Sequence, residues 1–288
     1  MTPMTGPGPD FRLMGIVNVT PDSFSDGGRY LDPQAAIEHA LELEREGAAI
    51  LDVGGESTRP GAEPVSLAEE LRRVVPVLEA LAAKRGRARL SIDTAKAPVA
   101  AAALDAGATF VNDVTALRHD PQMAELVARS GADCCLMHML GEPRTMQRNP
   151  RYEDVVGEVK AFLEARMAFA VAEGIAEERI VLDPGIGFGK KLEHNLELLR
   201  RLDELLTLGR PVSIGTSRKS FLGRLTGREV GDRVAGTIAT NVLAYERGAR
   251  VFRVHDVAPV RDALVVAAAT VRGEWASTTP TSSTTSTT

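Results

Sequence analysis

The regular alternation of short apolar runs with longer helical patterns is the feature that most constrains the fold of this chain. The β-type runs span residues 11–19, 49–55, 89–94, 109–114, 133–139, 179–184, 211–217 and 251–256. The helical patterns that follow them span residues 33–47, 66–85, 97–106, 120–130, 153–174, 192–206, 231–247 and 258–273. Strands that alternate with helices in this way are typical of a parallel sheet covered by helices.

The ends of several helical patterns are marked by residues that favour helix starts and stops. Pro33 and Pro121 each follow an Asp at a predicted start. The pair Gly-Ala follows a predicted stop at 47–48, 107–108, 131–132 and 248–249. Because proline is favoured in the first turn of a helix and glycine just past the last, these residues support the helix boundaries. The repeated Gly-Ala pair indicates one helix-to-strand turn used again and again.

Two architectures accommodate such an alternation. A doubly wound sheet normally carries a Gly-rich phosphate loop after its first strand, and no GxGxxG pattern follows residues 11–19. Eight strand–helix units in a chain of this size match an α/β fold of the (β/α)₈ TIM barrel type. We therefore predict a single (β/α)₈ domain over residues 11–275, a flexible N-terminus at 1–10, and a disordered Ser/Thr-rich tail at 276–288.

Charge and cysteine content restrict the partners and the compartment. With a net charge of −5 and an isoelectric point near 5.7, the chain is not expected to bind nucleic acid or a membrane surface. Cys134 and Cys135 are neighbours in a predicted strand, so their side chains should lie on opposite faces, and an ordinary disulfide between them is not expected. Residues 1–10 lack a signal-peptide pattern, and no apolar run has the length of a membrane span. We expect a cytoplasmic protein.

Polar side chains lie at or just beyond the predicted end of every strand. In chain order they are Asn18, the loop 54–61, Asp93, Asn112 with Asp113, His138, Asp183, the segment 216–220, and Arg253 with His255. A polar group buried without a partner costs roughly 1–3 kcal/mol, so their recurrence calls for a reason. In (β/α)₈ barrels the active site lies at the carboxyl ends of the strands. The pattern predicts one shared site there.

These residues divide into two chemical sets. The first set consists of Asp93, Asn112, Asp183 and Lys219. It combines acceptors, an amide and one cation, which suits a flat heterocycle with adjacent N–H donors, such as a 2-amino-4-oxopyrimidine. The second set consists of Asn18, Arg253, His255 and the loop 57–59. It suits a phosphate group and a hard cation. We expect one side of the barrel mouth to hold a ring and the other to hold an anion.

Longer motifs surround these residues. They are NVTPDSFSDGG (18–28), GGESTRPGA (54–62), SIDT (91–94), VND (111–113), LMHM (136–139), LDPGIGFGK (182–190), GTSRKSFLG (215–223) and RVHDV (253–257). In sequence and order they resemble the motifs of the dihydropteroate synthases, the folate-pathway enzymes that sulfonamides inhibit. The resemblance runs from about Met14 to Val257 and leaves out the segment 140–152 and both termini.

The resemblance implies a reaction and a role for each matching residue. Enzymes of this family join 6-hydroxymethyl-7,8-dihydropterin pyrophosphate to p-aminobenzoate, with Mg²⁺ as cofactor, and release pyrophosphate and 7,8-dihydropteroate. The implied catalytic residues are Asp93, Lys219, Arg253 and His255. The implied pterin site comprises Asp93, Asn112, Met137, Asp183, Phe188, Gly215 and Lys219. The implied p-aminobenzoate pocket comprises Phe24, Thr58, Arg59, Pro60 and Ser220. The implied pyrophosphate site comprises Asn18, Thr58, Arg59, Arg253 and His255, with Asn18 as the metal ligand. A homodimer is implied as well.

Two other functions remain open. A methyltetrahydrofolate-binding methyltransferase-type domain would share the barrel and its ring-binding carboxylates, but it needs no pyrophosphate site. A catalytically silent paralogue would bind the pterin without condensing it. The motifs at 18–28 and 54–62, together with Arg253 and His255, favour the synthase. His138 is predicted either to line the pocket or to support residues that do, and the pair Lys190–Lys191 is predicted to be exposed to solvent.

Overall fold

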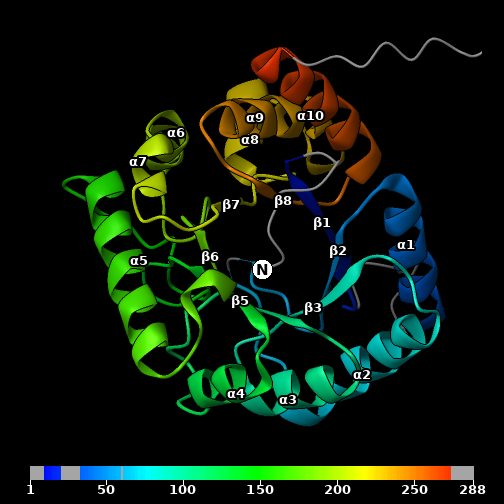
Figure 1. Cartoon of the computed structure of the whole chain (residues 1–288). Helices are drawn as coiled ribbons and strands as arrows, with labels where there is room; N and C mark the ends of the chain where they lie inside the picture. The colour runs from blue at the N-terminus through cyan, green and yellow to red at the C-terminus, as the bar shows by residue number, and fades with distance from the viewer. Residues whose placement is uncertain (1–9, 21–32, 60, 274–288) are drawn as a thin grey trace, which may run out of the picture.

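Eight parallel strands form the inner wall of the structure, and helices cover their outer side (Figure 1). The computed structural model describes residues 10–20, 33–59 and 61–273. The strands are β1 (Arg12–Asn18), β2 (Ile50–Gly54), β3 (Arg89–Asp93), β4 (Phe110–Asp113), β5 (Asp133–Met137), β6 (Ile180–Asp183), β7 (Ser213–Ile214) and β8 (Val251–Val254).

The helices lie between the strands along the chain. They are α1 (Pro33–Glu46), α2 (Leu67–Ala83), α3 (Ala97–Asp105), α4 (Met123–Ser130), α5 (Val155–Ala172), α6 (Leu192–Arg200), α7 (Asp203–Leu206), α8 (Ser220–Thr226), α9 (Val234–Glu246) and α10 (Val257–Arg272), with two 3₁₀ helices, η1 (Glu177–Arg179) and η2 (Val230–Asp232). Glycine ends α4 as predicted, because Gly131 adopts the left-handed conformation (φ 66°) that other residues rarely take.

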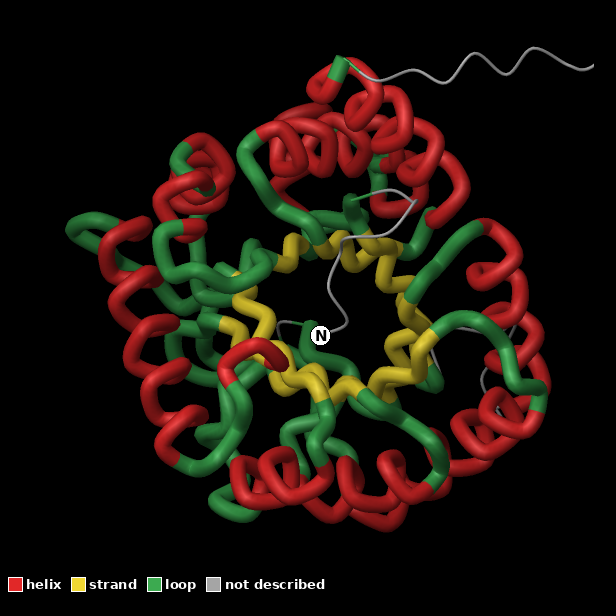
Figure 2. The backbone as a smooth tube through the Cα atoms, in the orientation of Figure 1, coloured by secondary structure: helices red, strands yellow, loops and turns green. Residues whose placement is uncertain are grey.

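The strands pair in the order β6-β5-β4-β3-β2-β1-β8-β7, and every pair is parallel. An isolated parallel bridge between Leu182 and Val212 links β6 to the start of β7, so the sheet closes into a ring (Figure 2). Because all strands run the same way, all their carboxyl ends lie at one end of the barrel. The predicted (β/α)₈ fold class is therefore confirmed.

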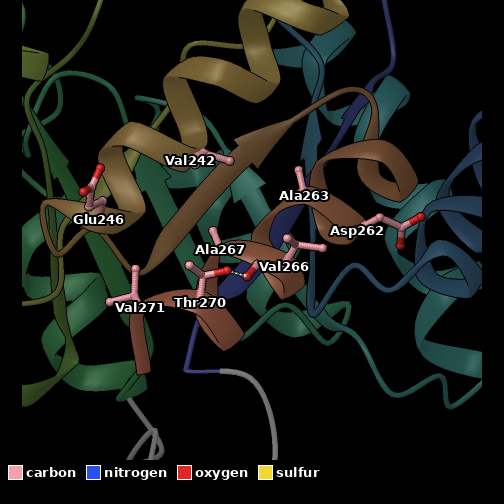
Figure 3. A pocket seen from close by; sticks show the side chains of 8 residues that line it. All are labelled: Val242, Glu246, Asp262, Ala263, Val266, Ala267, Thr270 and Val271. Atoms are coloured by element: carbon pink, nitrogen blue, oxygen red, sulfur yellow. Dashed lines mark hydrogen bonds between the residues drawn. The ribbon is translucent and has the colours of Figure 1, made fainter. Parts of the chain in front are cut away.

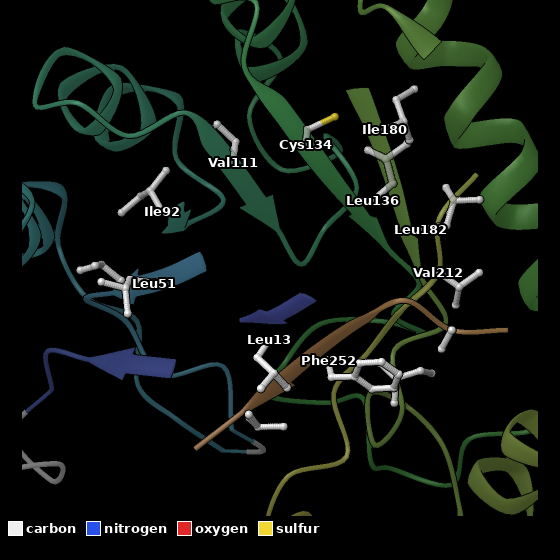
Figure 4. Close-up of a cluster of buried hydrophobic side chains, with 14 of the residues drawn as sticks. Leu13, Leu51, Ile92, Val111, Cys134, Leu136, Ile180, Leu182, Val212 and Phe252 are labelled. Atoms are coloured by element: carbon white, nitrogen blue, oxygen red, sulfur yellow. The ribbon is translucent and has the colours of Figure 1, made fainter. Parts of the chain in front are cut away.

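Alternation along the strands divides the apolar core into two layers. Outward-facing residues such as Leu51, Ile92 and Phe252 belong to the large cluster between strands and helices (Figure 4). A smaller inner cluster consists of Met14, Ile50, Phe110, Cys135, Val181 and Val251. Cys134 belongs to the outer cluster and Cys135 to the inner one, and both thiols are free, as the alternation predicted. Truncating the fully buried Phe110 to alanine should cost roughly 3–5 kcal/mol.

Two helical predictions differ from the structure. The pattern at 192–206 forms two helices rather than one, because the chain turns at Arg201–Leu202 and brings the fully buried Leu202 and Leu205 onto the core. The pattern at 120–130 becomes helical only at Met123, since Asp120 forms a turn whose side chain accepts a hydrogen bond from the amide of Gln122 (3.0 Å).

The region after β7 was predicted least well. The strand predicted at 211–217 has two residues, because beyond Ile214 the chain leaves the ladder to form the loop that precedes α8. No helix was predicted at α8, whose Gly223 and closing Gly227 interrupt the helical pattern. Phe221 and Leu222 nevertheless bury this helix against the core.

Other predictions concern the chain ends and the membrane. Residues 1–9 and 274–288 lie outside the described residues, so the domain boundaries at 10/11 and 275/276 stay predictions. Asp10 is described, and its carboxylate accepts a hydrogen bond from the hydroxyl of Tyr245 (2.8 Å). None of the described helices combines the length and the apolar composition of a membrane span.

Candidate active site

The strand register places predicted site residues side by side at the carboxyl end of the barrel. Asp93 is paired with Gly54 on one side and with Asn112 on the other, and Met137 is paired with Asp183. Each of these residues alternates with outward-facing apolar neighbours, so each faces the barrel interior. The structure therefore brings together the ring-binding set that the sequence predicted from separate strands.

Asp52, on β2, accepts hydrogen bonds from side chains of three other strands. Its Oδ1 accepts a hydrogen bond from Oγ of Ser91 (2.5 Å), and its Oδ2 accepts from Nδ2 of Asn112 (2.8 Å) and from Nε of Arg253 (2.6 Å). The carboxylate is fully buried. Since charge-assisted hydrogen bonds are the strong ones, Asp52 fixes the orientation of both Asn112 and Arg253.

The guanidinium of Arg253 is held between two carboxylates. Its Nη2 donates to Oδ2 of Asp93 (2.6 Å), while its Nε donates to Asp52. Burial raises the pKa of Asp93 to about 7, because Arg253 only partly offsets it and the charge of Asp52 adds to it. Burial opposes the charge of Arg253, but Asp52 and Asp93 together raise the pKa of Arg253. One cation shared by two buried carboxylates favours additional positive charge nearby.

A second group of residues lies where the pterin ring is predicted to bind, and this region is called the predicted slot. Nζ of Lys219 donates to the carbonyl of Ile186 and lies 4.6 Å from the centroid of the Phe188 ring. Burial lowers the pKa of Lys219 to about 8, against the attraction of Asp183. Oδ1 of Asp183 accepts from the amide of Gly185 (2.7 Å), and burial raises the pKa of this carboxyl although Lys219 opposes the shift. A carboxylate, an ammonium and an aromatic face thus meet in one slot.

The wall of the slot is apolar and tightly built. Met137 packs in a buried cluster with Met146, and Phe188 packs against that cluster. Met146 comes from the segment 140–152, which carries no recognised motif. The chain turns sharply at Gly185 (φ +67°), where an added Cβ would lie 1.9 Å from the carbonyl oxygen of His138. Only glycine fits there, and the turn sets the start of the loop that carries Phe188.

Gly215 lies between the two sides of the predicted site. An added Cβ at Gly215 would lie 3.8 Å from Nζ of Lys219 and 3.9 Å from Cβ of Arg253. The first of these residues belongs to the ring-binding set and the second to the anion-binding set. The absence of a side chain at Gly215 therefore leaves room where the two sides meet.

His255, just past β8, contacts the neighbouring loop. Its Nδ1 lies 3.0 Å from Oγ of Ser217, and its backbone amide donates to the same oxygen (3.1 Å). Burial lowers the pKa of His255 to about 3, and Arg253, Arg218 and Arg59 add to the effect. The imidazole is therefore neutral at physiological pH and can donate one ring hydrogen.

The loop after β2 carries Thr58 and Arg59, and a partly buried ionic cluster anchors it. Nζ of Lys96 donates to Glu56 (2.6 Å), to Glu70 (2.5 Å) and to the carbonyl of Val65 (2.9 Å). Glu70 is fully buried. These contacts tie the base of the loop to α2 and α3, while the side chain of Arg59 stays exposed.

The predicted p-aminobenzoate pocket is described only in part. Thr58 is half-buried, and Arg59 and Ser220 are exposed, with Ser220 as the first residue of α8. Phe24 and Pro60 lie outside the described residues. The assignment of these five residues to one pocket stays a prediction.

Two residues near the slot were predicted differently or left open. The predicted exposure of Lys190 is wrong: its side chain is buried because Nζ donates to the carbonyl of Phe188 (3.0 Å) and contacts Nδ1 of His138 (2.8 Å), which replace water. His138 packs edge-to-face on Phe162 (4.8 Å between ring centroids), and burial lowers the pKa of His138 to about 2. His138 therefore supports the loop behind the slot.

Sequence reasoning assigned no role to Asp52, placed Ser217 only within the segment 216–220, and overvalued Asp113. A charged residue inside the apolar run 50–53 was the available signal for Asp52, since such a group needs a buried partner. Asp113 was grouped with Asn112, but its carboxylate accepts hydrogen bonds from the amides of Thr115 (2.8 Å) and Leu117 (2.9 Å). It orders the turn after β4 and faces away from the site.

A magnesium ion would find few protein ligands at this site. Within the described ranges, no three His, Cys, Asp or Glu side chains are grouped to hold a metal. Asn18 ends β1 and is paired with Gly54, which is paired in turn with Asp93. Mg²⁺ commonly keeps several waters and binds one or two protein groups plus substrate phosphates. The donor set fits an ion held mainly by a phosphate substrate.

Comparisons with known proteins agree with this geometry. The family described as "Pterin binding enzyme" matches residues 14–255. A dihydropteroate synthase of Neisseria meningitidis is 49% identical over 261 residues, which cover 88% of this chain and 91% of that protein.

Solved structures show the same likeness. A Yersinia pestis dihydropteroate synthase in a sulfonamide drug complex superimposes with a TM-score of 0.86 at 46% identity, covering 91% of this chain and 94% of that one. A Xanthomonas albilineans dihydropteroate synthase in complex with 7,8-dihydropteroate superimposes with a TM-score of 0.80 at 48% identity, covering 88% and 91%. This chain therefore belongs to the pterin-binding enzymes and, among them, to the dihydropteroate synthase family.

Proposed function

We propose that this chain condenses 6-hydroxymethyl-7,8-dihydropterin pyrophosphate with p-aminobenzoate to give 7,8-dihydropteroate and pyrophosphate. The observation that carries the proposal is the contact of Arg253 with Asp93 and Asp52. Through it an anion-binding cation adjoins a set of buried ring-binding acceptors. A substrate that is a ring at one end and a polyanion at the other matches this arrangement.

Ring recognition is assigned to the slot around Asp183. Its carboxylate would accept hydrogen bonds from the 2-amino group and the adjacent ring N–H of the pterin. Lys219 would donate to a ring acceptor, and Phe188 would lie against the ring face. Asn112, oriented by Asp52 (2.8 Å), would contribute its amide oxygen. Met137 and Gly215 would bound the slot.

Leaving-group binding is assigned to the opposite side. Arg253 and Arg59 would pair with pyrophosphate oxygens, His255 would donate a ring hydrogen, and Thr58 would donate its hydroxyl hydrogen. Asn18 would hold Mg²⁺, which when bound supplies a further positive charge to the same oxygens. Fixed charges placed where negative charge develops usually supply most of the rate enhancement in reactions of this kind.

The bond changes follow from these two sides. The bond between the pterin methylene carbon and the pyrophosphate oxygen breaks, and its electron pair leaves with the pyrophosphate. The electron-rich dihydropterin shares the positive charge that develops on the carbon, and the nearby Asp93 carboxylate stabilises it. The amine nitrogen of p-aminobenzoate then forms the new C–N bond and releases one proton to solvent.

No protein nucleophile is needed for this reaction. Burial raises the pKa of Cys134 to about 12 and raises that of Cys135 well above its usual value, so neither thiol provides a thiolate. The p-aminobenzoate itself is assigned to a pocket of Phe24, Thr58, Arg59, Pro60 and Ser220, where Arg59 and the hydroxyls would meet its carboxylate and the remaining residues its ring.

Pyrophosphate release separates this function from the two alternatives, and pterin binding separates the alternatives from each other. The enzyme is mixed with Mg²⁺ and pterin pyrophosphate, with and without p-aminobenzoate, and pyrophosphate is measured. The synthase releases pyrophosphate rapidly only when both substrates are present. A silent paralogue binds the pterin compound and releases none. A methyltetrahydrofolate-binding domain also releases none and, in a titration, binds the free pterin as tightly as the pyrophosphorylated one. No release of pyrophosphate by folded enzyme would overturn the proposal.

We further propose that the protein forms a homodimer through α9 and α10. An apolar groove between these helices is lined by Val242, Val266, Ala267 and Val271 (Figure 3). Val266 is 67% exposed and Val271 is 56% exposed. A groove that meets its own copy about a two-fold axis buries the same residues twice, which is the commonest form of symmetric assembly.

The oligomeric state tests this interface. Val266→Glu should convert the dimer to a monomer in analytical ultracentrifugation. The matched control is Val171→Glu, which changes an exposed valine on α5 (42% exposed) and should leave the dimer intact. A wild-type monomer, or a dimer that survives Val266→Glu, would contradict the interface. The two buried free thiols support a cytoplasmic location, which we also propose.

A further inference from the structure

Ser217 makes two contacts with one residue, His255. Its Oγ accepts a hydrogen bond from the backbone amide of His255 (3.1 Å) and lies 3.0 Å from the ring Nδ1. Ser217 is 5% exposed, and within the described ranges Nδ1 is the one acceptor that its hydroxyl meets. The proposed function gives Ser217 no role of its own, because Ser217 is not placed against a substrate.

The available donors and acceptors determine whether Ser217 or His255 supplies the hydrogen between Oγ and Nδ1. The backbone amide is always a donor, so it occupies a lone pair of the serine oxygen. The hydroxyl hydrogen of Ser217 then has Nδ1 as its partner, which requires a bare nitrogen at that position. In a neutral imidazole the other nitrogen, Nε2, must carry the hydrogen. We propose that Ser217 is a positioning residue, which holds His255 in the Nε2–H tautomer so that the imidazole donates to the departing pyrophosphate.

A second contact fixes the same two loops beside this pair. Arg218 and Asp256, the next residues along each loop, form a two-pronged ion pair, with Nε donating to Oδ2 (3.0 Å) and Nη2 to Oδ1 (2.5 Å). Arg218 has a left-handed backbone (φ 56°), which a residue other than glycine adopts only when its surroundings hold it there. The two contacts form successive links between the loops after β7 and β8.

The charges around His255 favour a neutral ring. Burial is the largest cause and lowers the pKa of His255 to about 3; the charges of Arg253, Arg218 and Arg59 act in the same direction, and that of Asp256 opposes them. A neutral ring exists as two tautomers, and only the one with hydrogen on Nε2 can both accept from Ser217 and donate from its far edge. Loss of the Ser217 hydroxyl removes the preference for that tautomer.

The tautomer can be read directly from the folded enzyme. Histidine labelled with ¹⁵N in the ring is incorporated, and the signal of His255 is identified by its loss in His255→Gln. In the wild type, Nε2 should carry the hydrogen and Nδ1 should be bare. In Ser217→Ala both tautomers should be populated, and Ser217→Thr, which keeps a hydroxyl, should restore the single tautomer. A wild-type hydrogen on Nδ1, or an unchanged tautomer in Ser217→Ala, would overturn the proposal.

Kinetics provide the second readout, and this part rests on the function proposed above. Ser217→Ala should lower kcat roughly 10- to 100-fold, by analogy with the loss of partners that orient histidines in metal sites, with KM for p-aminobenzoate unchanged. Ser217→Thr should recover most of the rate. The matched control is Ser130→Ala, which removes a hydroxyl that donates to the carbonyl of Val127 at the end of α4 (3.0 Å).

The histidine spectrum and the kinetics test different claims. A wild-type enzyme that releases no pyrophosphate would refute the proposed function, while its histidine spectrum would still decide the tautomer. Because the wild-type spectrum does not depend on Ser217→Ala, the proposal stays decidable even where that variant does not fold. Full activity in a folded Ser217→Ala variant would show that the tautomer, whichever it is, does not serve the reaction.

Discussion

Nη2 of Arg253 lies 2.6 Å from Oδ2 of Asp93, so a cation of the proposed anion-binding side contacts a carboxylate of the proposed ring-binding side. The two halves of the proposed substrate site are therefore physically linked. A bound pyrophosphate attracts the same guanidinium. Any hydrogen bond that the guanidinium then gives to pyrophosphate in place of Asp93 leaves the charge of that carboxylate less neutralised. This is the place where the developing positive charge on the pterin needs an anion. Ring and leaving group are thus expected to act on each other through this pair.

The pH dependence of kcat/KM for pterin pyrophosphate follows from two shifted groups. Burial raises the pKa of Asp93 to about 7, so below that pH the carboxyl is protonated and cannot stabilise a cation. Burial lowers the pKa of Lys219 to about 8, so above that pH the ammonium is lost. We expect a narrow bell with its maximum between these values. The Asp93→Asn variant should have a lower kcat/KM, and its pH profile should lack the acidic limb. If the acidic limb persists in the variant, another group causes it.

Asp52 and Asp93 are predicted to differ sharply in their effect on stability. Asp52 accepts from three donors, and Asp52→Asn turns one acceptor oxygen into a donor, which should cost roughly 3–5 kcal/mol of unfolding free energy. Asp93→Asn should cost far less at pH 8 and is the matched control. Urea unfolding of both variants gives the comparison, and equal losses would contradict the central place of Asp52.

Ionisation of Asp93 destabilises the folded state. Its pKa rises from 3.8 to about 7 on folding, so between these values the native state binds a proton that the unfolded state does not. Stability contributed by this group is therefore present below pH 3.8 and is lost as the pH rises through about 7. Removal of the charge in Asp93→Asn offsets that loss at pH 8.

A substitution at Asp183 tests whether its carboxylate binds the pterin. Asp183→Asn keeps the shape of the side chain but presents a donor to the donors of the pterin edge, and the mismatch should cost roughly 2–5 kcal/mol of binding free energy. Oδ1 can still accept from the amide of Gly185, so the loop should persist. Calorimetric titration of pterin pyrophosphate gives the affinity. Wild-type affinity in the variant would refute the assignment.

Asn18 should separate turnover from ring binding. If it serves Mg²⁺ and pyrophosphate, Asn18→Ala should reduce turnover roughly 10- to 100-fold. Binding of a free pterin without phosphates should hardly change. The control is Asn149→Ala, which removes an exposed amide in the segment 140–152. If the variant loses turnover and free-pterin binding in equal measure, Asn18 belongs to the ring slot or to the fold.

The barrel, and the gathering of polar residues at one of its ends, were predictable from the alternation of strands and helices and from the alternation of side chains along each strand. Period-two alternation placed Asp93, Asn112, Asp183 and Arg253 on inward faces, and the shared direction of the strands brought them to one end. The partners of these residues were less accessible. Asp52 meets Asn112 and Arg253 across sequence separations of 60 and 201 residues, and no local pattern encodes such pairings.

Elements that depend on loop geometry were also missed. Lys190 follows a Gly-rich loop, and its burial depends on a turn that brings the carbonyl of Phe188 within 3.0 Å of Nζ. Ser217 stands in a motif where several residues have hydroxyl or cationic side chains, and its role becomes visible only when His255 is beside it (3.0 Å). Helix α8 was not predicted because Gly223 interrupts its helical pattern, although Phe221 and Leu222 are buried in the structure.

The formation of the new C–N bond is the most direct test of the proposed reaction. p-Aminobenzoate labelled with ¹⁵N at its amine is incubated with enzyme, Mg²⁺ and pterin pyrophosphate. The pteroate product and pyrophosphate are then quantified by mass spectrometry and by phosphate analysis. We expect one labelled nitrogen in each 7,8-dihydropteroate and an equal amount of pyrophosphate. Pyrophosphate released without labelled product, or no pyrophosphate at all from folded enzyme, would contradict the proposed reaction.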